Sequence, residues 1–253
     1  MEQEQLKKVT LWYLLVTFVI MGAVWGGILI AQHYGYIKSD SVMFFPLFIL
    51  GGASTTIASF LVLVKSGVSV KEWLANVFGI KQKPCFYLIV LLLLVCYTAL
   101  GYLTGSFTLS MPLGLLFLFS LQNIIAGGLE QAGWSYILQP NLEKSMPFGL
   151  AAFIFGTIWV LWHLPLFFMD GVAQQSMNFG LYFIFMLGYA FSLAAIRRLT
   201  GSVWLCVLFH ASLNAVLTVF AVEFSLIKTS IISTAMIIIS LLLVSAKERT
   251  YSK

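Results

Sequence analysis

Long apolar runs separated by short polar segments make up most of this chain. A membrane span needs roughly 20 apolar residues. Lipid offers the backbone no hydrogen-bond partners, so we expect each such run to form a helix. Eight runs qualify: 10–32, 42–64, 85–104, 112–138, 147–168, 177–195, 202–221 and 229–246. The fourth is long and polar in its second half, and we expect it to tilt or to leave the membrane near Gln139-Pro140.

Basic residues between these runs predict the orientation of the protein. If the N-terminus is cytoplasmic, only Lys38 and Lys228 fall outside, and the other twelve of the 14 Lys and Arg residues fall inside. Cytoplasmic loops carry such an excess of positive charge. We therefore expect an all-α polytopic membrane protein of about eight helices, N-in and C-in, with residues 1–253 forming a single transmembrane domain.

One polar segment has a helical pattern of its own. Between the second and third runs, apolar residues recur at helical spacing within 68–79: Val70, Trp73, Leu74, Val77 and Phe78. Lys71 and Glu72 lie off that stripe. We expect an amphipathic helix in the cytoplasmic interface that anchors the connector. A gate for substrate is the alternative.

Composition agrees with the apolar pattern. The chain is 60% hydrophobic and 9% charged, which excludes water-soluble enzyme folds. Topology accounts for the net charge of +5, so we expect no nucleic-acid partner. The three cysteines fall in or beside apolar runs, which is typical of buried thiols rather than of a disulfide framework.

Three ionisable residues stand within the apolar runs. They are Glu130, His163 and His210, and Asn214 lies one helical turn after the last. Ionisable groups are costly in lipid and usually face a protein interior or a wet cavity, where they do chemistry. The four residues together predict an intramembrane active site.

Local patterns around these residues support the prediction and also leave structural alternatives. Asn123, Gly127 and Glu130 share one face of a helix, and the paired glycines allow a neighbouring helix to approach. Glu130 could instead pair with a buried cation or reach the cytoplasm. Pro165 predicts a kink beside His163, although a buried histidine is often only structural. His210 and Asn214 could simply join two helices.

The chemistry of this set fits hydrolysis. A carboxylate can act as general base toward water, and an imidazole can share that water or protonate the leaving amine. A second imidazole and a carboxamide can donate hydrogen bonds to an oxyanion. Glu130, His163 and His210 could also hold zinc with a fourth position open for water. By residue count, Glu130 and His210 lie ~12–13 Å from the inner edge and His163 roughly twice as deep, unless residues 139–150 run along the interface.

Three short motifs resemble those of the CAAX-protease and bacteriocin-processing (CPBP, or Abi) family of intramembrane endopeptidases. The family's first motif, Glu-Glu-x-x-x-Arg, stands here as Glu130-Gln131-Ala132-Gly133-Trp134-Ser135. The second, Phe-x-x-x-His, stands as Trp159-x-x-x-His163, and the third, His-x-x-x-Asn, as His210-x-x-x-Asn214. The resemblance covers roughly residues 110–220, which we expect to form a protease-type core.

This resemblance implies a role for each residue. Glu130 and His163 would activate water, while His210 and Asn214 would stabilise the oxyanion. The supporting residues would be Gln131, Ser135, Trp159 and Asn123. We favour the metal-free mechanism over zinc, with no cofactor. The substrate would be a peptide or membrane protein cut near the cytoplasmic side, in CAAX-type processing, in pheromone or bacteriocin maturation, or in bacteriocin self-immunity. The location would be a bacterial plasma membrane.

Two positions depart from the family pattern. Gln131 replaces the second Glu and Ser135 replaces the Arg, so a potential ion pair disappears as a unit. This is consistent with a retained active site. It is equally consistent with an inactive immunity or scaffold protein of the same family. A small proton-coupled transporter is a third hypothesis, although no inverted repeat supports it.

Overall fold

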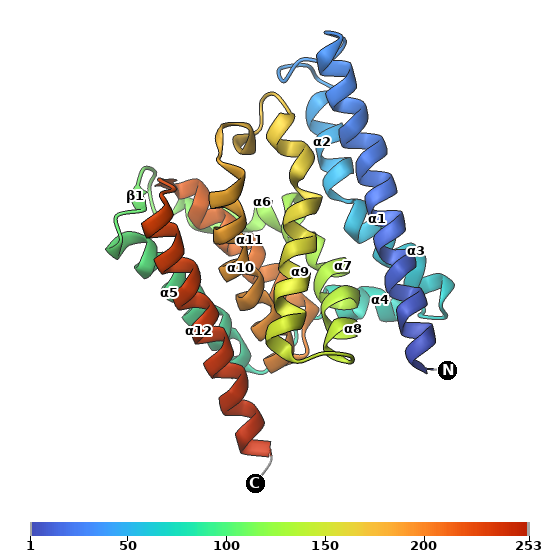
Figure 1. Ribbon diagram of the computed structural model, residues 1–253, viewed down its shortest axis with the longest axis vertical. Helices are drawn as coiled ribbons and strands as arrows, with labels where there is room; N and C mark the ends of the chain where they lie inside the picture. The colour runs from blue at the N-terminus through green and yellow to red at the C-terminus, as the bar shows by residue number, and fades with distance from the viewer. Residues whose placement is uncertain (1, 252–253) are drawn as a thin grey trace.

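The computed structural model describes residues 2–251, and these are almost entirely helical (Figure 1). The predicted all-α class is confirmed. The α-helices are α1 (Glu2–His33), α2 (Phe44–Gly52), α3 (Ser54–Lys65), α4 (Val70–Val77), α5 (Pro84–Leu103), α6 (Leu115–Ala126), α7 (Gln131–Gly133), α8 (Gln139–Glu143), α9 (Phe148–Trp162), α10 (Phe179–Thr200), α11 (Val203–Val219) and α12 (Leu226–Tyr251). Short 3₁₀ turns cover Gly128–Glu130, Leu164–Phe168 and Ala173–Ser176, and a π-helical turn covers Trp134–Leu138.

The helices coincide with the eight predicted apolar runs, but not every run forms a single helix long enough to cross a membrane. Within the described residues, five helices are long and apolar enough to span a membrane. Two further candidates are bent pairs: α2 with α3, at 45°, and α6 with Gly128–Glu143, at 41°. Counting each pair as one span gives up to seven, and α11 is a shorter apolar helix. The number eight therefore stays a prediction.

The most buried helices lie at the centre of the bundle. On α10 and α11, whole turns are enclosed, and Tyr189 and Phe209 are almost fully buried. By contrast, α1 and α5 leave large apolar side chains such as Leu11 and Leu88 more than half exposed. Apolar side chains on an outer face match a hydrocarbon environment. The outer helices thus separate the centre from lipid.

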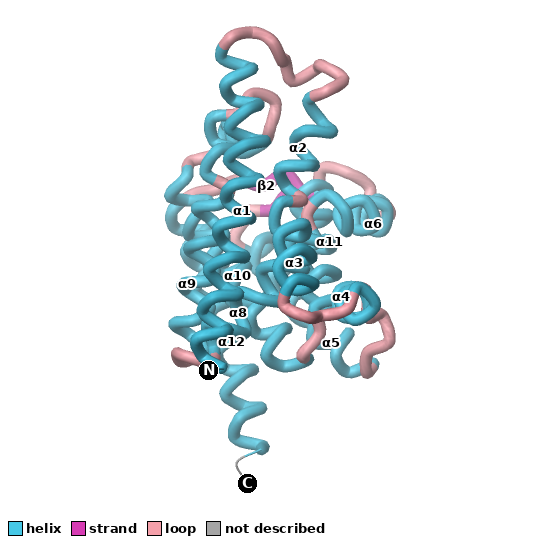
Figure 2. The backbone as a smooth tube through the Cα atoms, turned by 90° about the vertical axis from the view of Figure 1, so that its right-hand side faces the viewer, coloured by secondary structure: helices cyan, strands magenta, loops and turns pink. Residues whose placement is uncertain are grey.

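The predicted amphipathic segment is a short helix, α4, that lies across the long ones (Figures 1 and 2). Its apolar stripe divides in two. Trp73 and Val77 are buried against the bundle, and the Trp73 indole Nε1 donates to Ser59 Oγ at 3.0 Å. Val70 and Leu74 remain 47% and 45% exposed. This second edge is the one available to a membrane interface, where its placement stays a prediction.

A two-stranded sheet was not expected from the apolar pattern. Strand β1 (Phe107–Leu109) pairs antiparallel with β2 (Phe220–Val222), with Phe107 opposite Val222. The predicted seventh run, 202–221, is helical only to Val219 and then becomes extended. The final residues of that run were therefore wrongly predicted as helix, because Phe220 and Ala221 are as apolar as the residues before them.

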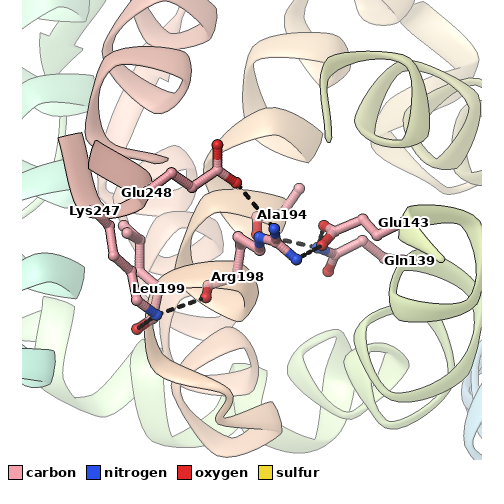
Figure 3. A network of polar contacts seen from close by, with 7 residues as sticks. All are labelled: Gln139, Glu143, Ala194, Arg198, Leu199, Lys247 and Glu248. Atoms are coloured by element: carbon pink, nitrogen blue, oxygen red, sulfur yellow. Dashed lines mark hydrogen bonds and ion pairs between the residues drawn. The ribbon is translucent and has the colours of Figure 1, made fainter. Parts of the chain in front are cut away.

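Both ends of the described chain lie in the lower half of the molecule (Figure 1). A network of polar contacts there joins α8, α10 and α12 (Figure 3). Arg198 contacts Glu143 at 3.3 Å and Glu248 at 2.9 Å, and Lys247 Nζ donates to the Arg198 carbonyl at 3.2 Å. Exposed ion pairs contribute at most about 1 kcal/mol each.

Candidate active site

Glu130 lies where a membrane helix breaks. Helix α6 ends at Ala126, and Gly128–Glu130 follow as a 3₁₀ turn. A Cβ on Gly127 would lie 2.7 Å from Asn214 Nδ2, and one on Gly128 would lie 2.8 Å from the Val207 carbonyl oxygen. The two glycines therefore let the break press directly against α11. The predicted close approach is confirmed, whereas the predicted continuous helix through Glu130 is wrong.

One cavity of about 850 Å³ unites the predicted catalytic residues. Glu130, His163, His210 and Asn214 all line it, and so do Trp159 and Asn123. These side chains come from α6 and the turn after it, from the end of α9 and from α11. The residues that the three motifs singled out are thus neighbours in space.

The predicted difference in depth between His163 and Glu130 is wrong. It assumed that the fourth run ends near residue 138, but the helical path continues to Glu143 before the chain turns into α9. At about 1.5 Å per residue, Glu130 stands roughly 20 Å from that turn and His163 roughly 22 Å. The two therefore reach the same level.

Trp159 is the central contact of the site. Its indole Nε1 donates to Glu130 Oε2 at 2.9 Å, and its backbone carbonyl bonds His163 Nδ1 at 2.8 Å. The indole ring lies 5.7 Å from the His163 ring and 5.3 Å from the His210 ring, edge to face in both cases. Trp159 is fully buried, so it holds three candidate catalytic side chains from inside the bundle.

His163 presents an acceptor nitrogen to the cavity. A carbonyl oxygen can only accept, so the bond to Trp159 fixes the proton of a neutral His163 ring on Nδ1. The other nitrogen, Nε2, then carries a lone pair. His163 caps the end of α9, and a 3₁₀ turn containing Pro165 follows. The distortion expected from the proline is therefore a helix end at the histidine rather than a bend within the helix.

His210 presents the opposite tautomer. Gln131 Nε2, an amide donor, lies 3.0 Å from His210 Nδ1. Nδ1 must accept there, so the proton sits on Nε2, the atom that a Cβ on Gly127 would meet at 3.2 Å. Ser135 Oγ donates to Gln131 Oε1 at 2.7 Å. The two residues that depart from the family motif thus hydrogen-bond each other as a neutral, buried pair.

Asn214 is oriented by Tyr189, a residue that the sequence analysis missed. The Tyr189 hydroxyl lies 2.9 Å from the His210 carbonyl oxygen and 3.4 Å from Asn214 Oδ1. Because Oδ1 faces the tyrosine, Nδ2 is turned toward Gly127 and the cavity. Nothing in the spacing of the run 177–195 distinguishes this tyrosine from other aromatic residues of the core.

Asn123 lines the cavity but turns its amide elsewhere. Its Nδ2 donates to the Phe119 carbonyl of its own helix at 2.9 Å. Within the described residues, no hydrogen bond joins Asn123 to a candidate catalytic side chain, and its supporting role stays a prediction.

A metal site was the alternative use of Glu130, His163 and His210. Throughout residues 2–251, no group of three or more His, Cys, Asp or Glu side chains is arranged to hold a metal ion. Glu130, His163 and His210 do not form such a group, and the choice between zinc and a metal-free mechanism stays a prediction.

Comparison with known families supports the resemblance. Residues 112–216 match the family model described as type II CAAX prenyl endopeptidase Rce1-like. The matched segment contains all three motifs and lies within the expected core at 110–220. A comparison with curated proteins finds no match. The resemblance predicted from the motifs is thus confirmed over this segment.

Proposed function

Because residues 112–216 carry an Rce1-like segment of the type II CAAX prenyl endopeptidases, we propose that this multi-pass membrane protein is an intramembrane endopeptidase. The observation that carries the proposal is the hydrogen-bond partners of the two histidines on one cavity, which assign the two rings opposite tautomers. One ring offers an acceptor in the cavity that Glu130 also lines, and the other offers a donor near the Asn214 amide. Hydrolysis of an amide needs both kinds of group.

In this proposal, Glu130 and His163 activate the attacking water. The carboxylate takes one proton from water, and His163 Nε2 accepts a hydrogen bond from the same water and aims it. The water oxygen then attacks the carbonyl carbon, and a C–O bond forms. The Trp159 indole N–H holds the carboxylate in position during this step.

His210 and Asn214 stabilise the negative charge of the oxyanion. As the C–O bond forms, negative charge collects on the former carbonyl oxygen. His210 Nε2–H and Asn214 Nδ2–H are donors already oriented toward the Gly127 break, which is the arrangement that an oxyanion needs. Gln131 and Tyr189 keep these two donors turned inward.

Collapse of the intermediate completes the reaction. The C–N bond breaks, and the proton taken up by Glu130 passes to the leaving nitrogen. The products are a new carboxyl terminus and a new amino terminus, and Glu130 returns to its starting state. Every proton in this sequence comes from water or a protein group, and the mechanism that we propose uses no metal ion.

The substrate we propose is a peptide or membrane-associated protein. The cavity lies in the half of the molecule that carries loops 34–43, 169–178 and 220–225, away from the two ends of the described chain. With the N-in orientation expected from the charges, this half faces outward. We therefore propose entry from the outer side of a bacterial plasma membrane, which replaces the expectation of cutting near the cytoplasmic side. Maturation or removal of a pheromone or bacteriocin peptide would fit.

The test compares cells that make the wild type with cells that make Glu130→Gln at equal protein level. Membrane and secreted peptides are collected from both and their termini are sequenced. We expect new termini with the wild type only, since loss of a general base reduces rate roughly 10²–10⁴-fold. Cleavage of such a peptide by the purified protein in ¹⁸O-labelled water should place one ¹⁸O in the new carboxyl group and persist with a zinc chelator.

The inactive immunity or scaffold role makes the opposite prediction. Identical peptide profiles from the two cell lines, with any immunity phenotype intact in Glu130→Gln, would overturn the protease. A transporter using the same residues would need its site to become accessible from both sides of the membrane. Labelling of the cavity from one side only would exclude that role.

A further inference from the structure

Strand β2 has one edge that the fold does not use. Its hydrogen bonds with β1 follow the antiparallel register, in which Glu223 N–H donates to the Ser106 carbonyl and Ser110 N–H to the Val219 carbonyl. Residues 219, 221 and 223 therefore turn their backbone groups toward β1. In an antiparallel ladder the alternate residues turn theirs the other way. Val222 thus directs both its N–H and its carbonyl away from β1.

These backbone groups have no partner within the described residues. Phe220 N–H is used by the last turn of α11, where it bonds the Val216 carbonyl. No hydrogen bond is found for the N–H or the carbonyl of Val222, nor for the carbonyl of Phe220. A strand with such an edge is a template for pairing with another chain. Without water or a partner, such groups are costly at membrane depth.

The unused edge belongs to the strand that faces the catalytic cavity. Phe220, Ala221 and Val222 line the cavity together with Glu130 and His210, whereas no residue of β1 does. Figure 2 draws the two strands in magenta in the upper half of the molecule, away from the C-terminus. The paired edge of β2 therefore lies against β1, and the residues of the strand that has the open edge line the cavity.

We propose that β2 binds the substrate as a third strand, so that an extended substrate segment pairs with the backbone of Val222 while its scissile bond lies at Glu130. This inference rests on the proposed protease function and adds the conformation of the substrate to it. Pairing through the main chain gives affinity with little demand on side chains. It also supplies hydrogen-bond partners to the backbone of a helical substrate, which has to unwind before it can be cut.

The geometry sets which part of the substrate pairs. Asn214 and β2 belong to one continuous stretch of chain, helical to Val219 and extended from there. At about 1.5 Å per helical residue and 3.3 Å per strand residue, Val222 lies up to roughly 17 Å from the oxyanion donors. An extended peptide covers that distance in about four to five residues. Pairing should begin about that far from the scissile bond.

The test uses ester substitutions in the substrate backbone. The probe is a synthetic peptide spanning the cleavage site found by comparing wild-type and Glu130→Gln cells, with one amide at a time replaced by an ester at three to seven residues from the cut. We expect KM to rise roughly 3- to 10-fold at every second position, because alternate residues of a strand face the same edge. The full-length protein in proteoliposomes is used throughout.

A change on the protein side completes the test. Val222→Pro removes one backbone N–H from the open edge, a position where a strand tolerates proline. Val222→Thr keeps that N–H and has a side chain of similar shape. We expect Val222→Pro to raise KM for the all-amide peptide and to weaken the alternation, with kcat and the unfolding temperature nearly unchanged. Val222→Thr, which keeps the N–H, should retain the alternation of the ester series.

The outcomes separate the two proposals. If the wild type cuts no peptide, the protease proposal itself fails. If cutting depends on Glu130 but esters act without alternation and Val222→Pro leaves KM unchanged, strand pairing is overturned and the protease stands. Should Val222→Pro unfold the protein, the ester series on the wild type still decides the question.

Discussion

At the scale of single residues, the site depends on which nitrogen of each histidine holds its proton. The three motifs predicted Glu130, His163, His210 and Asn214, and the structure brings all four to one cavity. The tautomers could not be predicted, because they depend on hydrogen-bond partners. The carbonyl one turn back serves His163, and the Gln131 amide serves His210. Only the fold shows that Gln131 has this partner.

Gly127→Ala tests the oxyanion donors without removing them. The added methyl would lie 2.7 Å from Asn214 Nδ2 and 3.2 Å from His210 Nε2, so both donors must shift. We expect kcat to fall roughly 10²–10³-fold, the usual effect of losing one such donor. Gly22→Ala is the matched control, because its Cβ would meet nothing within 4 Å. Equal activity of both variants with the purified protein would contradict the assignment.

Trp159→Phe tests the hydrogen bond to Glu130. The variant keeps an aromatic ring between the two histidines and loses the indole N–H that reaches the carboxylate, together with one ring of the indole. A hydrogen bond to a charged group contributes about 1.5–3 kcal/mol, so we expect kcat to fall roughly 10- to 100-fold with a smaller change in KM. Trp162→Phe is the matched control. It loses a hydrogen bond to Ser54 instead, and kcat should stay within a few fold of wild type.

At the scale of elements, apolar pattern predicted where helices lie better than where they break. The runs 42–64 and 112–138 read as continuous, but each is a bent pair of helices. The break at Gly127 depends on contact with α11, since both glycines lie against its side chains or backbone. A glycine pair in an apolar run predicts a helix break only when the helix that packs against it is known.

Helix α4 carries a prediction about stability at this scale. Trp73→Ala removes a buried ring that packs on Phe60 at 5.3 Å and bonds Ser59, and it should lower the free energy of unfolding by about 3–5 kcal/mol. Leu74→Ala, on the exposed edge of the same helix, should change it by less than about 1 kcal/mol. Unfolding in detergent measures both. Similar losses would mean that the two edges of α4 are buried alike.

At the scale of the whole molecule, the positions of the apolar helices could be predicted from the sequence, while the sheet could not. Lipid selects long apolar segments strongly, so their positions are visible in the sequence. A strand of three residues such as β2 leaves no comparable pattern. Its pairing with β1 joins residues more than 100 positions apart, and pairing over that distance depends on the packed helices.

Orientation is testable by labelling introduced cysteines with a membrane-impermeant maleimide in intact cells. The background replaces the three native cysteines with alanine. Tyr36→Cys and Ala173→Cys, both exposed in loops of the cavity half, should label without lysis, because the charge pattern puts this half outside. Ser145→Cys, exposed in the turn at the opposite end, should label only after lysis. The reverse pattern would place the cavity toward the cytoplasm.

The π-helical turn at Trp134–Leu138 affects how this chain can change in length. Such a turn holds one residue more than the α-helical turn it replaces. Deleting one residue within the turn can therefore restore regular α-helical winding and leave the segment beyond it facing the same way relative to Glu130. A regular α-helical turn has no extra residue to lose, so a deletion there would rotate everything beyond it by about 100°. Deleting Asn141, for example, would turn Glu143 away from Arg198. Between Glu130 and the turn into α9, single-residue deletions should therefore be tolerated at the π-helical turn and not in the regular turn that follows it.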